Sequence, residues 1–257
     1  MLPKQYRLTL YMKEFTRYVS YLISVLFLVG GAFAEGIPKD DFPKDYSPTI
    51  DKYYPNNVYW GDTHVHTNLS VDAYRWGNEV LGPEEAYRFA KGEEMTAYNG
   101  LKVRLQRPLD FLVVADHANS MGLLGAVIEK KDPALFLTKA GRRWANWVSK
   151  INADDPLKVR LDKLHELGID MWLRDLSEVE SFTRSVWHDV ITVADKHNEP
   201  GEFTAFIGFE WTPPFSLHRV LVFKDNADKA EEVLPLSSYY GSDPEGLWKY
   251  MEVYQTK

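Results

Sequence analysis

Residues 59–72 read YWGDTHVHTNLSVD, and this stretch decides the fold and points to the chemistry. It starts within a short apolar run, Val58 to Trp60, that predicts a buried strand. Residues two apart on an extended chain point to the same face. His64 and His66 are therefore expected to lie side by side at the strand end, where two imidazoles make a simple metal-binding pair.

Two acidic residues flank the histidine pair. A His-x-His pattern arises by chance in roughly one chain in five of this histidine content, so the pair alone is a weak signal. Asp62 lies on the same face of the predicted strand and is expected to orient an imidazole. Asp72 follows where the chain turns away and offers a hard oxygen ligand. The pair and the acids together favour a metal site.

Two further apolar runs predict strands that are buried on both faces of a mostly parallel sheet. Leu109 to Ala115 (LDFLVVA) ends at Asp116 and His117, and Thr204 to Phe209 ends at Glu210. In α/β folds the carboxyl ends of parallel strands meet at one face, where sites are built. We therefore expect candidate ligands from three strands to converge, with Asp116 orienting His117.

Glu210 is the most informative of these side chains. A carboxylate at the end of the apolar run FIGFE is costly to bury unless it binds something. The alternative to a metal ion is a buried ion pair, for example with Arg219. His218 leads into a further predicted strand, Val220 to Phe223.

Between Gly122 and Asn198 the pattern is mainly helical. A short helix is expected earlier, from Gly82 to Lys91, and a last one begins at Ser242. The clearest helix starts at Ser177, where Glu180 completes a capping box. Its apolar residues recur at helical spacing: Val179, Phe182, Val186, Val190 and Val193.

Histidines and tryptophans within the helical region have a structural interpretation. None of His165, His188 and His197 ends a strand, so each is expected to be a surface or packing residue. Four tryptophans are expected to pack the helices together, with a substrate wall as the alternative: Trp144, Trp147, Trp172 and Trp187.

The bulk composition limits the classes of function. The chain has 257 residues, 45% of them hydrophobic, which is enough for one sizeable core. It contains no cysteine, which excludes disulfides, thiolate metal sites and a cysteine nucleophile. The formal net charge is −7, and this acidity argues against a nucleic-acid or anionic-membrane surface.

The first 34 residues resemble a secretory signal. Basic residues through Arg17 precede the apolar segment Val19 to Val29, and Ala32-Phe33-Ala34 supplies an A-x-A cleavage site. The alternative is an uncleaved anchor, although the apolar run is shorter than the roughly 20 residues of a spanning helix. We expect cleavage, no further membrane attachment, a periplasmic or secreted protein, and an extended lead-in over residues 35–57.

Imidazoles and carboxylates without sulfur suit Zn, Mn or Fe, and suit more than one ion. Closely spaced ions that share a carboxylate polarise a phosphoryl oxygen and lower the pKa of a bound water. The sequence has no G-x-S-x-G elbow, P-loop or dinucleotide fingerprint. Metal-dependent hydrolysis of a small molecule is therefore the favoured chemistry.

The ordered motifs GDTHVHT, VVADHANS, FIGFEWT and HRVLVF resemble the PHP (polymerase and histidinol phosphatase) superfamily, and more narrowly a secreted bacterial branch catalogued as a domain of unknown function. The resemblance runs from about Tyr59 to Lys257. It implies a distorted (β/α)7 TIM-like barrel with two or three divalent metal ions, hydrolysing phosphate esters. The barrel portion would span residues 58–257, with a helical insertion over residues 120–200.

The resemblance also implies which side chains bind the metal ions. His64 and His66 would hold the first ion, with Glu210 bridging. His218 would hold the second ion, and Asp72 and His117 the third.

One departure from the superfamily pattern concerns the C-terminal ligands. The pattern includes a further His and a final Asp-x-His, and neither follows His218 here. We expect a partial barrel and, if the chain ends at Lys257, an incomplete metal centre.

Three functions follow from these observations. The leading one is a metal-dependent phosphoesterase acting on a small-molecule phosphate ester, where Arg75 and Arg219 could hold a phosphate oxygen or form ordinary ion pairs. The second is an amidohydrolase-type enzyme that cleaves C–N or C–O bonds. The Ala-Asp-His and Gly-Phe-Glu motifs argue against this second function. The third is a catalytically inactive, truncated binding protein.

Overall fold

The computed structural model describes residues 57–257 apart from 152–154, 173–178 and 214–216. Val58–Lys257 forms one compact unit. The predicted signal segment 1–34 and nearly all of the lead-in 35–57 lie outside the described residues.

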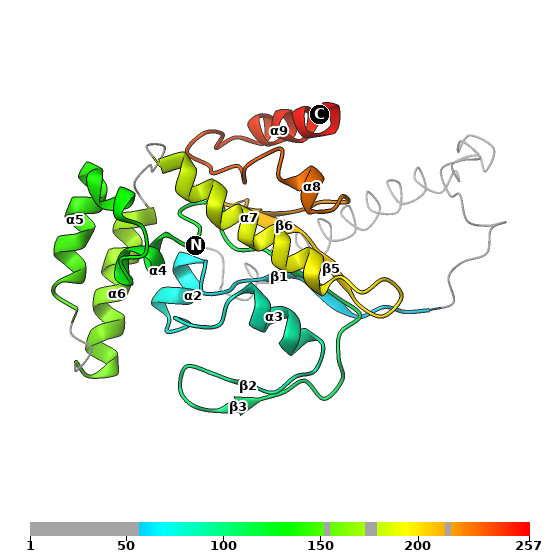
Figure 1. Ribbon diagram of the computed structural model, residues 1–257, viewed down its shortest axis with the longest axis horizontal. Helices are drawn as coiled ribbons and strands as arrows, with labels where there is room; N and C mark the ends of the chain where they lie inside the picture. The colour runs from blue at the N-terminus through cyan, green and yellow to red at the C-terminus, as the bar shows by residue number, and fades with distance from the viewer. Residues whose placement is uncertain (1–56, 152–154, 173–178, 214–216) are drawn as a thin grey trace, which may run out of the picture. The chain divides into compact units, whose positions relative to one another are not determined.

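Three parallel strands form the sheet on which the candidate site is built. β1 (Gly61–Val65), β4 (Phe111–Val114) and β5 (Thr204–Phe206) lie in the order β1-β4-β5 (Figure 1). Both neighbouring pairs are parallel, as the continuous apolar runs predicted. The carboxyl ends of these strands therefore lie at the same edge of the sheet.

The start of β1 differs from the prediction. Val58, Tyr59 and Trp60 precede the strand and are 71%, 62% and 57% exposed, so the buried strand expected there was wrong. Among the described residues, β1 lies at the edge of this sheet with β4 as its neighbour, and most of its residues are exposed. The backbone of Trp60 is nevertheless anchored, because its N–H donates to an Asp110 carboxylate oxygen at 2.7 Å.

The predicted strand over residues 204–209 is divided at Ile207. β5 ends at Phe206, and β6 (Gly208–Trp211) pairs antiparallel with β7 (Arg219–Val222) in a separate two-stranded sheet. A Cβ atom at Gly208 would lie 2.5 Å from Val113 Cγ1 and 2.7 Å from the Leu221 carbonyl oxygen. Because residue 208 is a glycine, the start of β6 can lie close to both β4 and β7.

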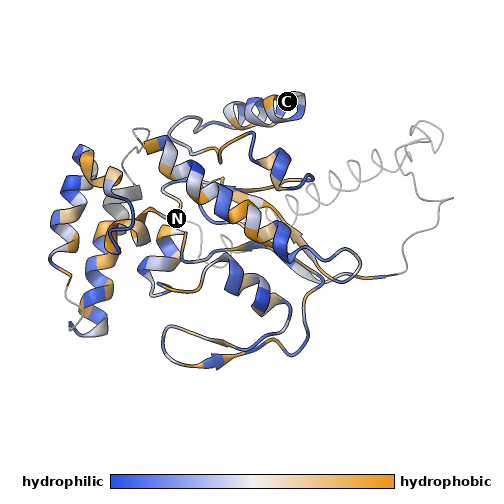
Figure 2. Ribbon diagram, in the orientation of Figure 1, coloured by the Kyte–Doolittle hydropathy of each residue, from blue (hydrophilic) through white to orange (hydrophobic). Residues whose placement is uncertain are grey.

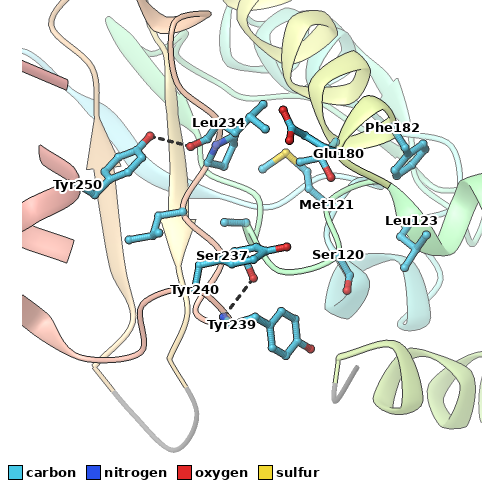
Figure 3. A pocket seen from close by; sticks show the side chains of 14 residues that line it. Ser120, Met121, Leu123, Glu180, Phe182, Leu234, Ser237, Tyr239, Tyr240 and Tyr250 are labelled. Carbon is cyan, nitrogen blue, oxygen red and sulfur yellow. Dashed lines mark hydrogen bonds between the residues drawn. The ribbon is translucent and has the colours of Figure 1, made fainter. Parts of the chain in front are cut away.

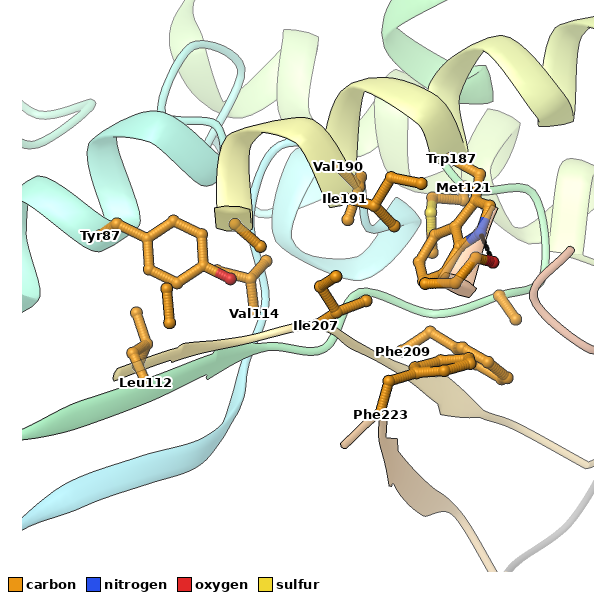
Figure 4. Packing of buried hydrophobic residues seen from close by; sticks show 14 of the residues in the cluster. Tyr87, Leu112, Val114, Met121, Trp187, Val190, Ile191, Ile207, Phe209 and Phe223 are labelled. Atoms are coloured by element: carbon orange, nitrogen blue, oxygen red, sulfur yellow. Dashed lines mark hydrogen bonds between the residues drawn. The ribbon is translucent and has the colours of Figure 1, made fainter. Parts of the chain in front are cut away.

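The main hydrophobic core lies between the strands and the helices α3 (Pro83–Ala90) and α7 (Glu180–His197). Figure 4 shows Trp187, Val190 and Ile191 of α7 facing side chains of the strands. The buried face of α7 comprises Trp187, Val190, Ile191, Ala194 and His197.

The predicted apolar face of α7 overlaps the observed buried face only in part. Val190 is buried as predicted, whereas Val186 and Val193 are partly buried and flank the core. Figure 2 shows hydrophilic and hydrophobic residues alternating along α7, as in an amphipathic helix. The predicted capping box cannot be compared, because Ser177 lies outside the described residues.

A second hydrophobic core joins α2 to the helices beside it (Figure 1). Its elements are α2 (Val71–Arg75), α4 (Leu123–Ile128), the 3-10 helix η1 (Pro133–Leu137), α5 (Lys139–Val148) and α6 (Leu157–Trp172). Trp144 is fully buried and Trp147 packs against this core, whereas Trp187 belongs to the main core. The side chain of Trp172 lies outside the described residues. The predicted insertion 120–200 thus contains helices of two different cores.

The remaining described elements are a short hairpin and two helices, which add Ala230 and Leu247 to the main core. β2 (Met95–Thr96) and β3 (Lys102–Val103) form an antiparallel hairpin. α8 (Ala227–Ala230) contacts α7. α9 (Pro244–Thr256) is capped at its N-terminus by Asp243, whose carboxylate accepts from the Gly246 N–H. The last helix was therefore predicted correctly.

Within the described ranges, the strands form three small sheets and none of them closes into a barrel. The (β/α)7 barrel accordingly stays a prediction. Among the described helices, none is both long and apolar enough to cross a membrane.

Candidate metal centre

Six side chains predicted as metal ligands lie together near the carboxyl ends of the strands. They form three overlapping groups, and in each group one ligand atom per residue lies within 4.8 Å of the others. The groups are His64, His66 and Glu210; His66, Asp72 and His117; and His117, Glu210 and His218. Chain segments up to about 150 residues apart in the sequence therefore meet at one place.

His64 on β1 and His66 directly after it have the geometry that their spacing predicted. The Nε2 atoms of His64 and His66 lie 3.0 Å apart, so both imidazoles point to the same side of the strand. The carboxylate of Glu210 faces this pair, with one oxygen 3.3 Å from His64 Nε2 and the other 3.2 Å from His66 Nε2.

Asp72 joins the imidazoles of His66 and His117. Its Oδ2 lies 3.0 Å from His66 Nδ1 and 3.3 Å from His117 Nε2. Asp72 reaches this position because the chain turns after β1 and starts α2 at Val71. The rings of His66 and His117 are 4.5 Å apart between centroids.

Backbone hydrogen bonds between β6 and the end of β4 place Glu210 beside His117. The Glu210 N–H donates to the Asp116 carbonyl at 2.9 Å, and the Ala118 N–H donates to the Glu210 carbonyl at 2.9 Å. His117 and Glu210 form a parallel bridge at this point. Although β6 belongs to another sheet, it therefore continues the parallel arrangement to the site.

The Glu210 side chain is 1% exposed and contacts four histidines. Besides His64 and His66, two further histidines contact it: His218 Nδ1 lies 2.9 Å from its Oε1, and His117 Nδ1 lies 2.6 Å from its Oε2. Glu210 Oε2 accepts no hydrogen bond in the described structure, despite the two nitrogens close to it. Burying a carboxylate oxygen in this way is unfavourable without a cation nearby.

The charged groups of the cluster shift one another's pKa values. Burial lowers the pKa of the His66 imidazole, but hydrogen bonding to Asp72 and the nearby Glu210 carboxylate outweigh burial and raise it to about 10. Burial would raise the pKa values of Asp72 and Glu210, yet the contacts with His117 and His66 hold both well below their usual range. The carboxylates are therefore ionised at neutral pH.

This donor set fits divalent metal ions. Imidazole nitrogens and carboxylate oxygens suit Zn, Mn or Fe. The buried Glu210 oxygen that accepts no hydrogen bond lies beside the imidazoles of His66 and His117, and a metal ion would take the place of protons that these rings hold in the metal-free chain. Because Glu210, His66 and His117 each belong to two of the three groups, the residues present can hold more than one ion.

The two acids expected to orient imidazoles accept hydrogen bonds from the strand backbone and from a loop residue. Asp62 accepts a hydrogen bond from the backbone N–H of His64 at 2.8 Å. Asp116 is 1% exposed and accepts from the N–H and the hydroxyl of Thr67, each at 2.6 Å. None of these hydrogen bonds involves an imidazole ring, and a role of these carboxylates in orienting imidazoles stays a prediction. The two carboxylates shape the strand and the loop that carry the ligands.

In the described structure, the two arginines proposed to hold phosphate form no hydrogen bond or ion pair with the six candidate ligand side chains. Arg219 donates to the His218 carbonyl at 2.8 Å, and Arg75 stacks near the ring of Trp76 at the end of α2. The alternative in which Glu210 pairs with Arg219 was also wrong, because Glu210 pairs with histidines. Phosphate binding by either arginine stays a prediction.

A buried polar network next to the site was missed by the sequence analysis. The Ser70 hydroxyl accepts from the His117 N–H at 2.9 Å, and the Thr212 hydroxyl lies 2.7 Å from His117 Nδ1. The amide of Asn119 binds the segment around Ser238. The available signal was proximity, since these residues lie within or beside the motifs THVHTNLS, ADHANS and FEWT.

The three helical histidines have the surface or packing positions that were predicted. His165 lies against the ring of Trp76, and His188 pairs with the exposed Glu231. His197 is buried and stacks on Tyr87. None of them belongs to a metal-ligand group in the described part of the chain.

A cavity of about 420 Å³ borders the loop that follows His117. Figure 3 shows Met121 and Phe182 on one side of the cavity, and Tyr239 and Tyr240 nearer the segment around Ser237. Its wall is mainly apolar and aromatic. The loop after β4 therefore contributes both to the ligand cluster and to this cavity.

Comparison with known proteins gives a match to a protein family. A family model described as "Protein of unknown function (DUF3604)" matches residues 53–257, which is more than half of the chain. No curated protein and no solved structure matches the chain. The family description gives no activity, so the chemistry must be argued from the site.

Proposed function

The chain belongs to the family of proteins of unknown function DUF3604, and from the chemistry of its site we propose that it is a metal-dependent hydrolase of phosphate esters. The observation that carries the proposal is the buried Glu210 carboxylate, whose two oxygens face nitrogens of four histidines. A carboxylate placed between groups of imidazoles is suited to bridge two cations.

Bound divalent ions would supply Lewis acidity toward a phosphoryl oxygen and lower the pKa of water. The side chains of the chain hold and orient that charge. Glu210 and His117 close the buried side of the centre, whereas the side chains of His64 and His218 are 46% and 42% exposed. We therefore expect the phosphate ester to approach from the side of His64 and His218.

The resemblance to the PHP superfamily supports the same function. The six matched positions, identified from short motifs, lie together in the folded chain. The order of parallel strands β1-β4-β5 is compatible with a portion of a (β/α)7 barrel. We accordingly propose PHP-type architecture and two or three bound ions of Zn, Mn or Fe.

The cavity suggests which part of a substrate binds beside the metal ions. It borders Ala118, the neighbour of His117, and is lined by several aromatic side chains. We propose that it receives the organic part of a small-molecule phosphate ester. An apolar or aromatic alcohol fits this lining better than a strongly charged one.

We also propose that the protein is secreted or periplasmic, on the signal-like composition of residues 1–34. Mass spectrometry of the protein exported by a bacterial host tests this. A mature N-terminus at Glu35 supports export, whereas an intact N-terminus in the cytoplasm contradicts it.

Turnover of defined substrates tests the function. The purified chain, supplied with Mn²⁺ or Zn²⁺, is assayed with an aryl phosphomonoester, an aryl phosphodiester, a lactone and a cyclic amide. We expect metal-dependent hydrolysis of a phosphate ester that is lost in His66→Ala and kept in His165→Ala. Ring opening of the lactone or amide alone would favour the amidohydrolase alternative. Metal binding with no turnover of any substrate would favour an inactive binding protein.

A further inference from the structure

Thr212 is a buried residue at the end of β6, and its hydroxyl touches the candidate ligand His117. It is 1% exposed, and its Oγ1 lies 2.7 Å from His117 Nδ1. We propose that Thr212 is a positioning residue that keeps a proton on His117 Nδ1, so that Nε2 is the metal-binding atom, which presupposes the metal centre proposed above.

The direction of the hydrogen bonds around Thr212 supports this assignment. The Thr212 hydroxyl donates to the Glu210 carbonyl at 3.3 Å, and a carbonyl can only accept. With its single proton used there, Thr212 Oγ1 has lone pairs available toward His117. The nitrogen that faces it, Nδ1, must then be the donor.

The Glu210 carboxylate independently favours the same tautomer. Its Oε2 lies 2.6 Å from His117 Nδ1, although it is not aligned to accept the ring N–H. At that distance an unprotonated nitrogen would place its lone pair against an anionic oxygen, whereas an N–H places positive charge there. Both oxygens near Nδ1 thus favour a proton on this nitrogen.

The other ring nitrogen then faces the metal-ligand group. His117 Nε2 lies 3.3 Å from Asp72 Oδ2, and His66 Nδ1 lies 3.0 Å from the same oxygen. In the metal-free chain the Asp72 carboxylate also favours a proton on Nε2. A bound metal ion would replace that proton, because a neutral imidazole binds a metal through its unprotonated nitrogen. His117 therefore joins His66 and Asp72, rather than sharing an ion with His218.

Thr212 is itself held in place by Asn119. The Asn119 amide nitrogen donates to the Thr212 carbonyl at 3.3 Å, and its oxygen accepts from the Ser238 N–H at 3.0 Å. Because one partner can only accept and the other can only donate, the orientation of this amide is defined. Asn119 is 2% exposed, so the network is shielded from water.

The tautomer can be measured directly. Long-range ¹H–¹⁵N correlation spectra of the full chain with ¹⁵N-labelled histidine distinguish protonated from unprotonated ring nitrogens. The spectra are recorded with saturating Zn²⁺, and His117→Ala identifies the His117 signals. We expect Nδ1–H with a metal-shifted Nε2. An Nε2–H tautomer would overturn the proposal, whichever reaction the protein catalyses.

Two variants separate positioning from packing. Thr212→Val keeps the shape but removes the hydroxyl, and Thr212→Ser keeps the hydroxyl. We expect Thr212→Val to lose about 10–100-fold in Zn²⁺ affinity, as when other groups that orient ligands are removed, and Thr212→Ser to restore it. Equal affinity and an unchanged tautomer in Thr212→Val would refute the role of Thr212. If the wild-type chain shows the Nδ1–H tautomer but binds no Zn²⁺, the metal-dependent function fails while the assignment of the proton stands.

Discussion

Replacing Glu210 by Gln gives the sharpest perturbation of the site, because it removes the charge and leaves the shape. The carboxylate is 1% exposed and lies 2.6–3.3 Å from four imidazole nitrogens. With an effective dielectric constant of about 20, opposite charges about 3 Å apart attract by roughly 5 kcal/mol before desolvation is subtracted. Removing one partner of a buried pair costs about 3–5 kcal/mol in measured cases.

Two effects should follow in Glu210→Gln. The metal-free protein should lose about 3–5 kcal/mol in its free energy of unfolding, because the imidazoles of His66 and His117, which are 18% and 5% exposed, lose their shared counter-charge. Metal affinity should fall by at least about 100-fold, which corresponds to about 2.7 kcal/mol. Urea denaturation in the presence of a chelator measures the first effect, and isothermal titration with Zn²⁺ measures the second.

Glu231→Gln is the matched control. Glu231 pairs with His188 at 2.9 Å, the distance at which Glu210 pairs with His218, but the side chains of Glu231 and His188 are 49% and 55% exposed. Exposed pairs contribute about 0–1 kcal/mol, so stability and metal affinity should change little. Wild-type metal affinity in Glu210→Gln would refute the assignment of Glu210 as a bridging ligand.

Three further predictions test the surroundings of the site. The metal-free protein should lose stability as the pH rises from 6.5 toward about 10, since the raised pKa of His66 means that folding favours its protonated form; denaturation at both pH values should show a drop that disappears in His66→Gln. Asp116→Asn should cost about 1–3 kcal/mol in calorimetry, because each carboxylate oxygen accepts one hydrogen bond from Thr67, whereas the amide oxygen can accept only one of them and the amide nitrogen cannot accept the other; an unchanged melting temperature would contradict this. Gly208→Ala should cost about 1–3 kcal/mol by urea denaturation, because the added Cβ would meet Val113 and the Leu221 carbonyl; a variant as stable as wild type would show that β4 and β7 can separate freely.

Much of the site could be predicted from the sequence because its signals are local. Residues two apart on an extended chain point to the same side. His64 and His66 do so, and their Nε2 atoms lie 3.0 Å apart. Apolar runs that end in polar residues identify buried strands and the edge where those strands end. His117 and Glu210 were found in this way.

Other features depend on contacts between distant segments, which no local pattern encodes. The division of one predicted strand at Ile207 arises because Gly208 must pass close to Val113 and β7. Asp116 accepts a hydrogen bond from Thr67, which is 49 positions away in the sequence. The position of Asp116 in the sequence, next to His117, gave no sign of this contact. The exposed run Val58 to Trp60 reflects the edge position of β1, which depends on the arrangement of the sheet rather than on its own hydrophobicity.

The metal content of the purified chain tests the central claim most directly. After growth with Zn and Mn and extensive dialysis, elemental analysis should find about two or three ions per chain, and His66→Ala should lower this value while His165→Ala does not. Fewer than about one ion per chain, unchanged by His66→Ala, would show that the six side chains do not form a metal centre.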